Sequence, residues 1–392
     1  MAGRGNALSR GELIALAFAL IWGGVLRLGW PGLSPFAFDE ARLSLMALEL
    51  ARNHVLPQAG LPSSAGIPNL PAQVWLFAIP YAFSTDPRIA SSFVGFFSFL
   101  CLPLAWWVAR RCWGPEAGLA AAWLMAGSPY LAFYSRSVWP QNWLPVMGAA
   151  WLATAAFRDR KLASFLNGFL AGFAFQVHYA GIALLIPSAL LFWFIPRQSR
   201  AAWLAGFLLA LSPALVYGAR LFKVAGKIEL KWTAGPESFL QMARLVSGMG
   251  WEVLLLGRSP GGNWKALLPA TATVFLAIWG LAVLLRDSIQ KPGGFHTLTL
   301  AAGLASPLLW FFRLAPPLIH YHLASLPALF LAAGSSAKLL PRRFRPLLVL
   351  LAAGISLAQG VNFAEGLNLW AARYAEGGLS APPVSYTHLR AH

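Results

Sequence analysis

The chain carries two adjacent carboxylates, Asp39 and Glu40, shortly after its first apolar stretch. Asp39 is a residue type that caps helix N-termini, and Phe38 and Leu43 have the spacing of a hydrophobic staple, so we expect a helix from here to about Arg52. One interpretation is that Asp39 only caps this helix. The other is chemical, because a carboxylate at a helix N-terminus beside a membrane span can meet a phosphate-bearing lipid and a metal ion.

The composition indicates which elements must position these carboxylates. Of the 392 residues, 58% are hydrophobic and only 11% are charged, whereas a soluble domain has about 25% charged residues. So few charges cannot cover a water-exposed surface of this size, which excludes a soluble globular enzyme. Intrinsic disorder is excluded because the chain has too much apolar side chain to remain solvated. The sequence therefore predicts a polytopic membrane protein.

Apolar runs along the chain predict an all-α fold with about eleven transmembrane helices. None of the runs contains Asp, Glu, Lys or Arg. Ion-coupled transporters place ionisable groups near the bilayer midplane, so this pattern argues against a secondary transporter. The runs are residues 13–26, 89–109, 117–133, 144–157, 162–175, 179–195, 201–217, 266–285, 295–312, 323–337 and 347–361.

The basic residues predict the orientation of these helices. A net charge of +17 would suggest nucleic-acid binding in a soluble protein. Here Lys and Arg instead cluster in alternate turns, as the positive-inside rule requires. We therefore predict no nucleic-acid partner, a multi-pass protein of the inner (plasma) membrane with a cytoplasmic N-terminus, and long external loops at 27–88 and 220–265. The predicted cytoplasmic segments contain Arg4, Arg10, Arg110, Arg111, Arg158, Arg160, Lys161, Arg197, Arg200, Arg286, Lys291, Lys338, Arg342, Arg343 and Arg345.

Two amphipathic helices are predicted on the membrane surface in the first external loop. The second covers residues 74–83, which are too few to cross a bilayer. The first has an apolar face opposite a polar one, as expected of a helix lying on a membrane. Its apolar face contains Leu43, Met46, Ala47 and Leu50, and its polar face contains Glu40, Ser44 and Glu49.

Short motifs lie at the predicted external ends of the spans. They are Asp39-Glu40-Ala41-Arg42, the turn Gly66-x-Pro68-Asn69-x-Pro71, Asp86-Pro87-Arg88, the segment from Tyr134 to Asn142, and His320-Tyr321-His322-Leu323 followed by Pro327. Together they resemble the polyprenyl-phosphate-dependent GT-C glycosyltransferases, in particular bacterial protein-mannosyltransferases and aminoarabinose-transferase-like enzymes of family 39. The resemblance covers nearly the whole chain through these motifs.

The resemblance implies an inverting transfer of a hexosyl or pentosyl group from a polyprenyl-phosphate-linked donor at the external membrane face. It implies that Asp39, with Glu40 as its partner, is the general base on the acceptor hydroxyl or helps to hold a divalent metal. The chemistry agrees, because displacing a phosphate requires a carboxylate to take the proton and cations to stabilise the leaving group. The candidates for binding the donor phosphate or substrate are Arg42, Arg136, Asn142, His178, His320, Tyr321 and His322.

Alternative roles exist for several of these residues. Arg136 has the position of a headgroup-contacting residue, and His178 that of an aromatic-belt residue. The three histidines offer only a His-x-His spacing, which is a weak zinc pattern. Many relatives carry an acid in the second external loop, where this chain has Gln141 and Asn142. The metal is therefore left open between Asp39 and Glu40, a weak ligand in Asn142, and a metal-independent reaction.

Residues 384–392 read VSYTHLRAH, which matches a translated sequencing adapter and no protein element. We therefore expect a GT-C-type transmembrane domain over residues 1–383, truncated at its C-terminus. A different functional class, a lipid or polysaccharide translocator without catalysis, has no need of an external acidic pair. A non-catalytic paralogue is a third possibility. The sequence identifies neither the sugar nor the acceptor, which is a protein, a lipid or a glycan.

Overall fold

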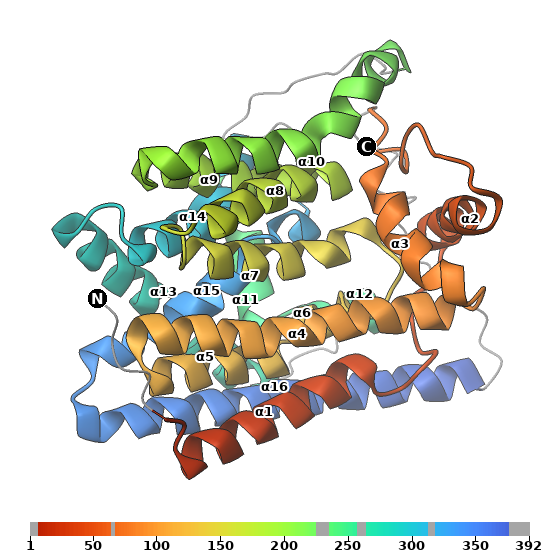
Figure 1. The fold of residues 1–392 in the computed structure, drawn as a ribbon. Coiled ribbons are helices and arrows are strands. Elements are labelled where there is room, and N and C mark those ends of the chain that lie inside the picture. Colours follow the sequence, from red (N-terminus) through yellow and green to blue (C-terminus); the bar gives the residue numbers. More distant parts are fainter. Residues whose placement is uncertain (1–6, 64–66, 225–234, 257–263, 313–317, 376–392) are drawn as a thin grey trace.

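The computed structural model of the chain is a bundle of helices that run roughly parallel or antiparallel to one another (Figure 1). The structure describes residues 7–63, 67–224, 235–256, 264–312 and 318–375. Within these ranges there is no β-strand, so the predicted all-α class is confirmed for the described part. The predictions for residues 384–392 and for the chain end lie outside the described residues.

The helices fall into two halves along the chain. The first half comprises α1 (Arg10–Leu28), α2 (Phe38–Asn53), α3 (Ala72–Phe83), α4 (Pro87–Trp113), α5 (Pro115–Gly127), α6 (Pro129–Phe133), η1 (Pro140–Trp143), α7 (Leu144–Ala155), α8 (Lys161–Val177), η2 (Tyr179–Leu184) and α9 (Leu185–Phe194). The second comprises α10 (Arg197–Val224), α11 (Glu237–Ser247), α12 (Trp251–Leu256), α13 (Trp264–Gln290), α14 (Phe295–Phe311), η3 (Ile319–His322), α15 (Leu326–Ser335), η4 (Ser336–Leu339), η5 (Arg342–Phe344) and α16 (Arg345–Ala375).

Two short helices, α5 and α15, form the centre of the bundle. Every residue of α15 is buried, as is every residue of α5 from Ala117 to Gly127, which agrees with their being apolar on all sides. α5 packs against α1, α4, α15 and α16. At Gly127 a Cβ atom would lie 2.2 Å from the carbonyl oxygen of Ser356, so α5 and α16 approach this closely only because the residue is glycine.

Each of the eleven apolar runs lies largely within helices of the structure. Four of the described helices, α1, α4, α13 and α16, are long and apolar enough to cross a membrane, and several shorter apolar helices accompany them. The run 117–133 is divided into α5 and α6 by Ser128, whose hydroxyl accepts a hydrogen bond from the Leu131 amide at 3.4 Å. Pro129 follows at the first position of α6, which suits a new helix start.

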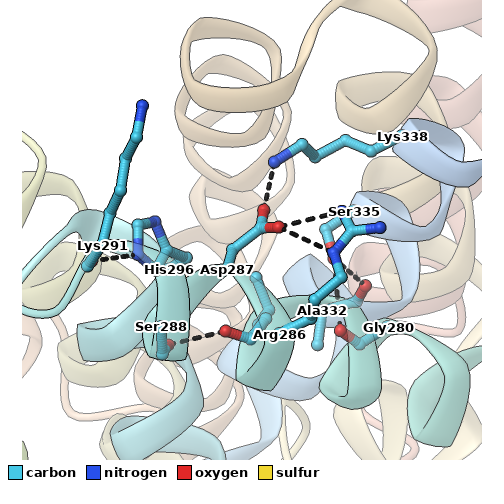
Figure 2. Close-up of polar contacts among 10 residues, drawn as sticks. Gly280, Arg286, Asp287, Ser288, Lys291, His296, Ala332, Ser335 and Lys338 are labelled. Atoms are coloured by element: carbon cyan, nitrogen blue, oxygen red, sulfur yellow. Dashed lines mark hydrogen bonds and ion pairs between the residues drawn. The ribbon is translucent and has the colours of Figure 1, made fainter.

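The bundle has two ends that differ in chemistry. We call the end that carries α2 and α3, at the right of Figure 1, the α2 end. The other end, where α13 and the N-terminal part of α16 lie, is called the basic end because it carries Arg110, Arg286 and Lys338. There Asp287 binds both Arg286 and Lys338 (Figure 2).

Candidate functional site

The acidic pair lies in the first turn of α2, but Asp39 is not its N-cap. The N-cap is Ala37, and the Glu40 carboxylate accepts a hydrogen bond from the Ala37 amide at 3.1 Å. Glu40 thus supplies the side-chain half of a capping box, because Ala37 has no acceptor of its own. Phe38 is 71% exposed while Leu43 is buried, so the expected staple is absent too. Both expectations were wrong because the helix begins at Phe38, two residues before the Glu40 start that an Asp39 N-cap requires.

The buried face of α2 includes polar residues that were expected to face solvent. Leu43 and Ala47 are buried as expected, but so are Glu40 and Ser44. The reason is that α2 packs against α3, and the Tyr81 hydroxyl of α3 donates to the Ser44 hydroxyl at 2.6 Å. A helix with a second helix beside it can bury a hydroxyl that finds a partner there. The polar-face prediction for Glu40 and Ser44 was therefore wrong.

The two carboxylates occupy different environments. Asp39 is half-buried, and among the described residues nothing donates to it. Glu40 is 8% exposed, and burial raises its pKa to about 7, with the negative charge of Asp39 acting in the same direction and backbone hydrogen bonds from Ala37 and Glu40 itself opposing it. Neither carboxylate forms an ion pair within the described part of the chain. Neighbouring carboxylates in different environments are a feature of proton-transfer sites.

The second predicted external loop connects α6 to η1 and contributes two of the expected residues. Asn142 is 1% exposed. Its amide nitrogen donates to both the carbonyl and the hydroxyl of Ser137, each at 2.9 Å, while its side-chain oxygen has no partner among the described residues. Arg136 is 5% exposed, and its guanidinium donates to backbone carbonyls at the end of α1. Asn142 therefore keeps an acceptor available, whereas the donors of Arg136 are engaged with the protein.

The expected histidines come together with aromatic rings between α8, η1 and η3. The ring centroid of His320 lies 4.8 Å from that of Trp139, 4.6 Å from that of Tyr321 and 6.5 Å from that of His178. His178 Nδ1 accepts from the Ala180 amide at 3.0 Å. Burial lowers the pKa of His178 to about 3 and holds the pKa of His320 well below its usual value. Burial therefore favours the neutral form of these rings, which can both donate and accept a hydrogen bond.

His322 belongs to the same segment and is fully buried. Its Nδ1 lies 3.2 Å from the Ser306 hydroxyl, and its Nε2 has no partner among the described residues. Burial lowers the pKa of His322 to about 4. His322 and Asn142 thus each present one buried, unpartnered polar atom, which is the kind of atom that a ligand or a water satisfies.

The structure does not bring every predicted residue into contact. Arg42 is exposed on α2, and no hydrogen bond joins the acidic pair to the histidine cluster within the described ranges. Two residues that were not among the predicted site residues connect the histidine cluster to the two external loops. Tyr179 donates to the Pro68 carbonyl at 2.6 Å and so ties η2 to the first loop, and Trp139 packs against His320. Trp139 lies inside the motif from Tyr134 to Asn142, and Tyr179 follows His178 directly. Their closeness in sequence to predicted site residues is the signal that could have identified them.

No protein-family profile matches the sequence, and no curated protein matches it. Solved structures do match. ArnT (aminoarabinose transferase) from Cupriavidus metallidurans in the apo state aligns over 98% of this chain and 80% of its own, with 12% identity and a TM-score of 0.65. The same enzyme bound to undecaprenyl phosphate aligns over 93% of this chain and 78% of its own, with 14% identity and a TM-score of 0.59.

An archaeal protein shares the same architecture. The Archaeoglobus fulgidus oligosaccharyltransferase in the apo form covers 95% of this chain and 56% of its own, with 14% identity and a TM-score of 0.57. That enzyme was also solved in a complex with zinc and sulfate, with a TM-score of 0.54. In the described residues of the present chain, no group of three or more His, Cys, Asp and Glu side chains could hold a metal ion.

These neighbours are GT-C-fold glycosyltransferases that match almost the entire chain. At 12–14% identity, the likeness shows the fold alone. The chain has the GT-C fold.

Proposed function

We propose that the protein is a membrane glycosyltransferase that moves a sugar from a polyprenyl-phosphate-linked donor to an acceptor at the external membrane face. The observation that carries this proposal is the acidic pair in the first turn of α2, which has no cation partner among the described residues. The fold supports it, since one neighbour of that fold was solved with undecaprenyl phosphate bound. We also propose that the chain resides in the plasma membrane with its N-terminus in the cytoplasm.

The proposed reaction is a direct displacement at the anomeric carbon. The acceptor hydroxyl oxygen forms a bond to that carbon as the bond from the carbon to the phosphate oxygen breaks, and the configuration inverts. Asp39 takes the proton of the acceptor hydroxyl, and the bonding electrons leave with the lipid phosphate. Glu40 acts through Asp39, because its negative charge, once ionised, makes the neighbouring carboxylate a better base.

The leaving phosphate needs a cation or hydrogen-bond donors. Arg42 is exposed and lies three residues after Asp39, so on a helix it belongs to the same face. We assign the phosphate contact to Arg42. Arg136 is a poorer choice because its donors already bind carbonyl oxygens.

We assign sugar recognition to the segment around His178, His320, Tyr321 and His322, together with Asn142. The unpartnered atoms His322 Nε2 and Asn142 Oδ1 are suited to hydroxyl groups. Neutral imidazoles can also exchange donor and acceptor roles with a hydroxyl. Both features favour a polyhydroxylated ligand over a second anion.

The test is an assay with the purified full chain in liposomes, supplied with polyprenyl-phosphate-linked hexoses and pentoses and a membrane extract as the source of acceptor. We expect one donor to be consumed, with release of the free polyprenyl phosphate, by the wild type and not by Asp39→Asn. A translocator would instead move the intact donor across the bilayer without cleaving the sugar–phosphate bond. That result, unchanged in Asp39→Asn, would contradict the proposal.

A further inference from the structure

The segment between α1 and the acidic pair is held by one buried arginine from a distant loop. The Arg136 side chain donates to five carbonyl groups, with nitrogen–oxygen distances from 2.8 to 3.5 Å. Each of its three nitrogens has at least one such acceptor. Cations favour the C-terminal end of a helix, where carbonyl groups lack intrahelical partners. The acceptors are the carbonyls of Leu26, Arg27, Gly29, Trp30 and Leu33.

The held segment is conformationally strained. Trp30 adopts a φ of 52° and Gly32 a φ of 85°, and only glycine takes such values freely. A non-glycine residue in this region persists when its surroundings fix it. Trp30 is fixed from two sides, because its carbonyl accepts from Arg136 at 2.9 Å and its indole donates to Asn368 of α16 at 2.7 Å.

A second set of contacts fixes the other side of the same loop. The Ser34 hydroxyl donates to the Arg136 carbonyl and lies 3.1 Å from the Ser91 hydroxyl of α4. Near Ser91, a Cβ on Gly95 would lie 3.1 Å from the Arg27 carbonyl and 3.4 Å from the Ser135 carbonyl. The end of α1, the start of α4 and the second loop therefore meet at close range. Ser34 is five positions before Asp39, so this junction fixes where α2 begins.

A second buried arginine, Arg27, also donates to backbone carbonyls, but these belong to a different helix. Arg27 is 3% exposed and donates to the carbonyls of Met125 and Ala126 at 2.8 and 3.0 Å. These carbonyls belong to the C-terminal end of α5. Arg27 therefore stabilises the central helix, and within the described residues none of its side-chain hydrogen bonds goes to the segment after Gly29.

From these contacts we infer that Arg136 is a positioning residue for the acidic pair: its guanidinium holds the strained loop from Gly29 to Leu33 and thereby sets the place of Asp39 and Glu40. The inference rests on the proposed function for its catalytic consequence, but its structural part does not. Burial lowers the pKa of Arg136 to about 10, which leaves the side chain charged at neutral pH.

The test compares Arg136→Gln with Arg27→Gln as a matched control, both in a background where Cys101 and Cys112 are replaced by alanine. A nitroxide label on Phe36→Cys, at an exposed site in the loop, reports the order of the segment by electron paramagnetic resonance. We expect the label to become more mobile in Arg136→Gln and to stay unchanged in Arg27→Gln. Unchanged mobility in Arg136→Gln would overturn the inference.

Transfer kinetics give the second readout. For Arg136→Gln we expect kcat to fall by at least ~10-fold with an unchanged donor KM, since displacement of a reacting group by about 1 Å can cost ~100-fold. For Arg27→Gln we expect kcat per folded molecule to be retained. A rise in the donor KM with kcat retained would identify Arg136 as a phosphate ligand and would overturn the inference.

A covalent rescue separates positioning from general stability. Cysteines at Ser34 and Ser91, introduced without the label, should form a disulfide that replaces the lost contacts of Arg136→Gln, because the native hydroxyls are only 3.1 Å apart. We expect oxidation to restore most of kcat and reduction to abolish the rescue, and no rescue on oxidation would count against a positioning role. If the wild type itself transfers no sugar, the proposed function fails, and the label result alone then decides whether the loop depends on Arg136.

Discussion

Within the described residues, Glu12 and Asp287 at the basic end are paired with cations, whereas Asp39 and Glu40 at the α2 end are not. At the basic end, Glu12 pairs with Arg110 at 2.5 Å, and Asp287 lies between Arg286 and Lys338 (Figure 2). At the α2 end, Asp39 and Glu40 have no ion pair within the described residues, although the half-buried Asp86 there pairs with the exposed Arg88 at 2.6 Å. The buried Arg136 donates to backbone carbonyls of the loop that precedes the acidic pair.

The paired carboxylates at the basic end stabilise the fold, whereas the acidic pair at the α2 end remains able to exchange a proton with a substrate. A carboxylate already paired with a cation has a lower affinity for a proton. Burial instead raises the pKa of Glu40 to about 7, so this carboxyl binds and releases a proton near neutral pH, which suits proton transfer. We therefore expect mutations at the α2 end to reduce activity and mutations at the basic end to reduce stability.

The largest expected effect comes from Asp39→Asn. Asn cannot take a proton from the acceptor, so turnover should fall by at least the ~100-fold that general-base catalysis contributes. Thermal stability in detergent should stay unchanged, because Asp39 neither caps α2 nor accepts a hydrogen bond among the described residues. Glu49→Gln, an exposed acid on the same helix, is the control and should transfer normally. An equal loss of turnover in Asp39→Asn and Glu49→Gln would contradict a specific catalytic role for Asp39.

Glu40→Gln should reduce transfer by ~10-fold at pH 8, because the charge of a neighbouring group changes the strength of a base by about this much. The variant should also lose the rise of turnover with pH that ionisation of Glu40 causes. In the wild type, burial raises the pKa of Glu40 from 4.5 to about 7, so turnover should rise with pH around 7 as Glu40 ionises. Gln still accepts the Ala37 amide through its side-chain oxygen. A pH profile that is identical in both proteins would exclude Glu40 from the mechanism.

The same shift predicts a change in stability. Between pH 4.5 and about 7, the folded protein keeps the Glu40 proton that the unfolded chain loses. Stability should therefore fall as the pH rises through this window and show no further loss from this group above it. Glu40→Gln should lack this decline, so its Tm relative to the wild type should be higher at pH 8 than at pH 5.

Arg42→Gln should have a smaller effect on the donor. Loss of an exposed phosphate contact worth about 1 kcal/mol corresponds to a KM about 5-fold higher, with kcat little changed. High salt should weaken donor binding by the wild type and have less effect on the variant. Arg52→Gln, an exposed cation in the last turn of α2, should behave like the wild type. The assignment fails if both variants raise KM equally.

The smallest effect is expected from Asp287→Asn at the basic end. Its partners Lys338 and Arg286 are 36% and 49% exposed, so the ion pairs are weak contributors, worth about 1 kcal/mol or less. The Tm should fall by only ~2 °C. Scanning calorimetry or fluorescence-detected unfolding in detergent checks this, and a Tm unchanged within error would mean that these pairs contribute nothing.

The sequence predicted the apolar helices well because each residue of a long apolar run supports the same structure. It failed where a partner lies far away in the chain. Glu40 and Ser44 were assigned to a solvent-facing side from their spacing in α2, and only the position of Tyr81 in α3 shows that this side is buried. The start of α2 was misplaced because the capping group is Glu40, which acts on the residue three positions before it.

The contacts of Arg136 could not be predicted from the sequence at all. Its acceptors are carbonyl groups, which every residue has, and they lie more than a hundred positions earlier in the chain. No side-chain pattern identifies such a contact. By contrast, the approach of His178 to His320 and Tyr321 was anticipated, because all three were expected at the same ends of their helices.

The most direct test of the account is one transfer assay that compares Asp39→Asn with Asp287→Asn, each measured per mole of folded protein in the same liposomes. If the α2 end carries the chemistry, Asp39→Asn should fall below about 1% of wild-type turnover, as loss of a general base requires, while Asp287→Asn stays close to the wild type. If Asp39→Asn retains most of its turnover, or both variants lose it equally, the acidic pair is not the catalytic group and the proposed separation between the two ends is wrong.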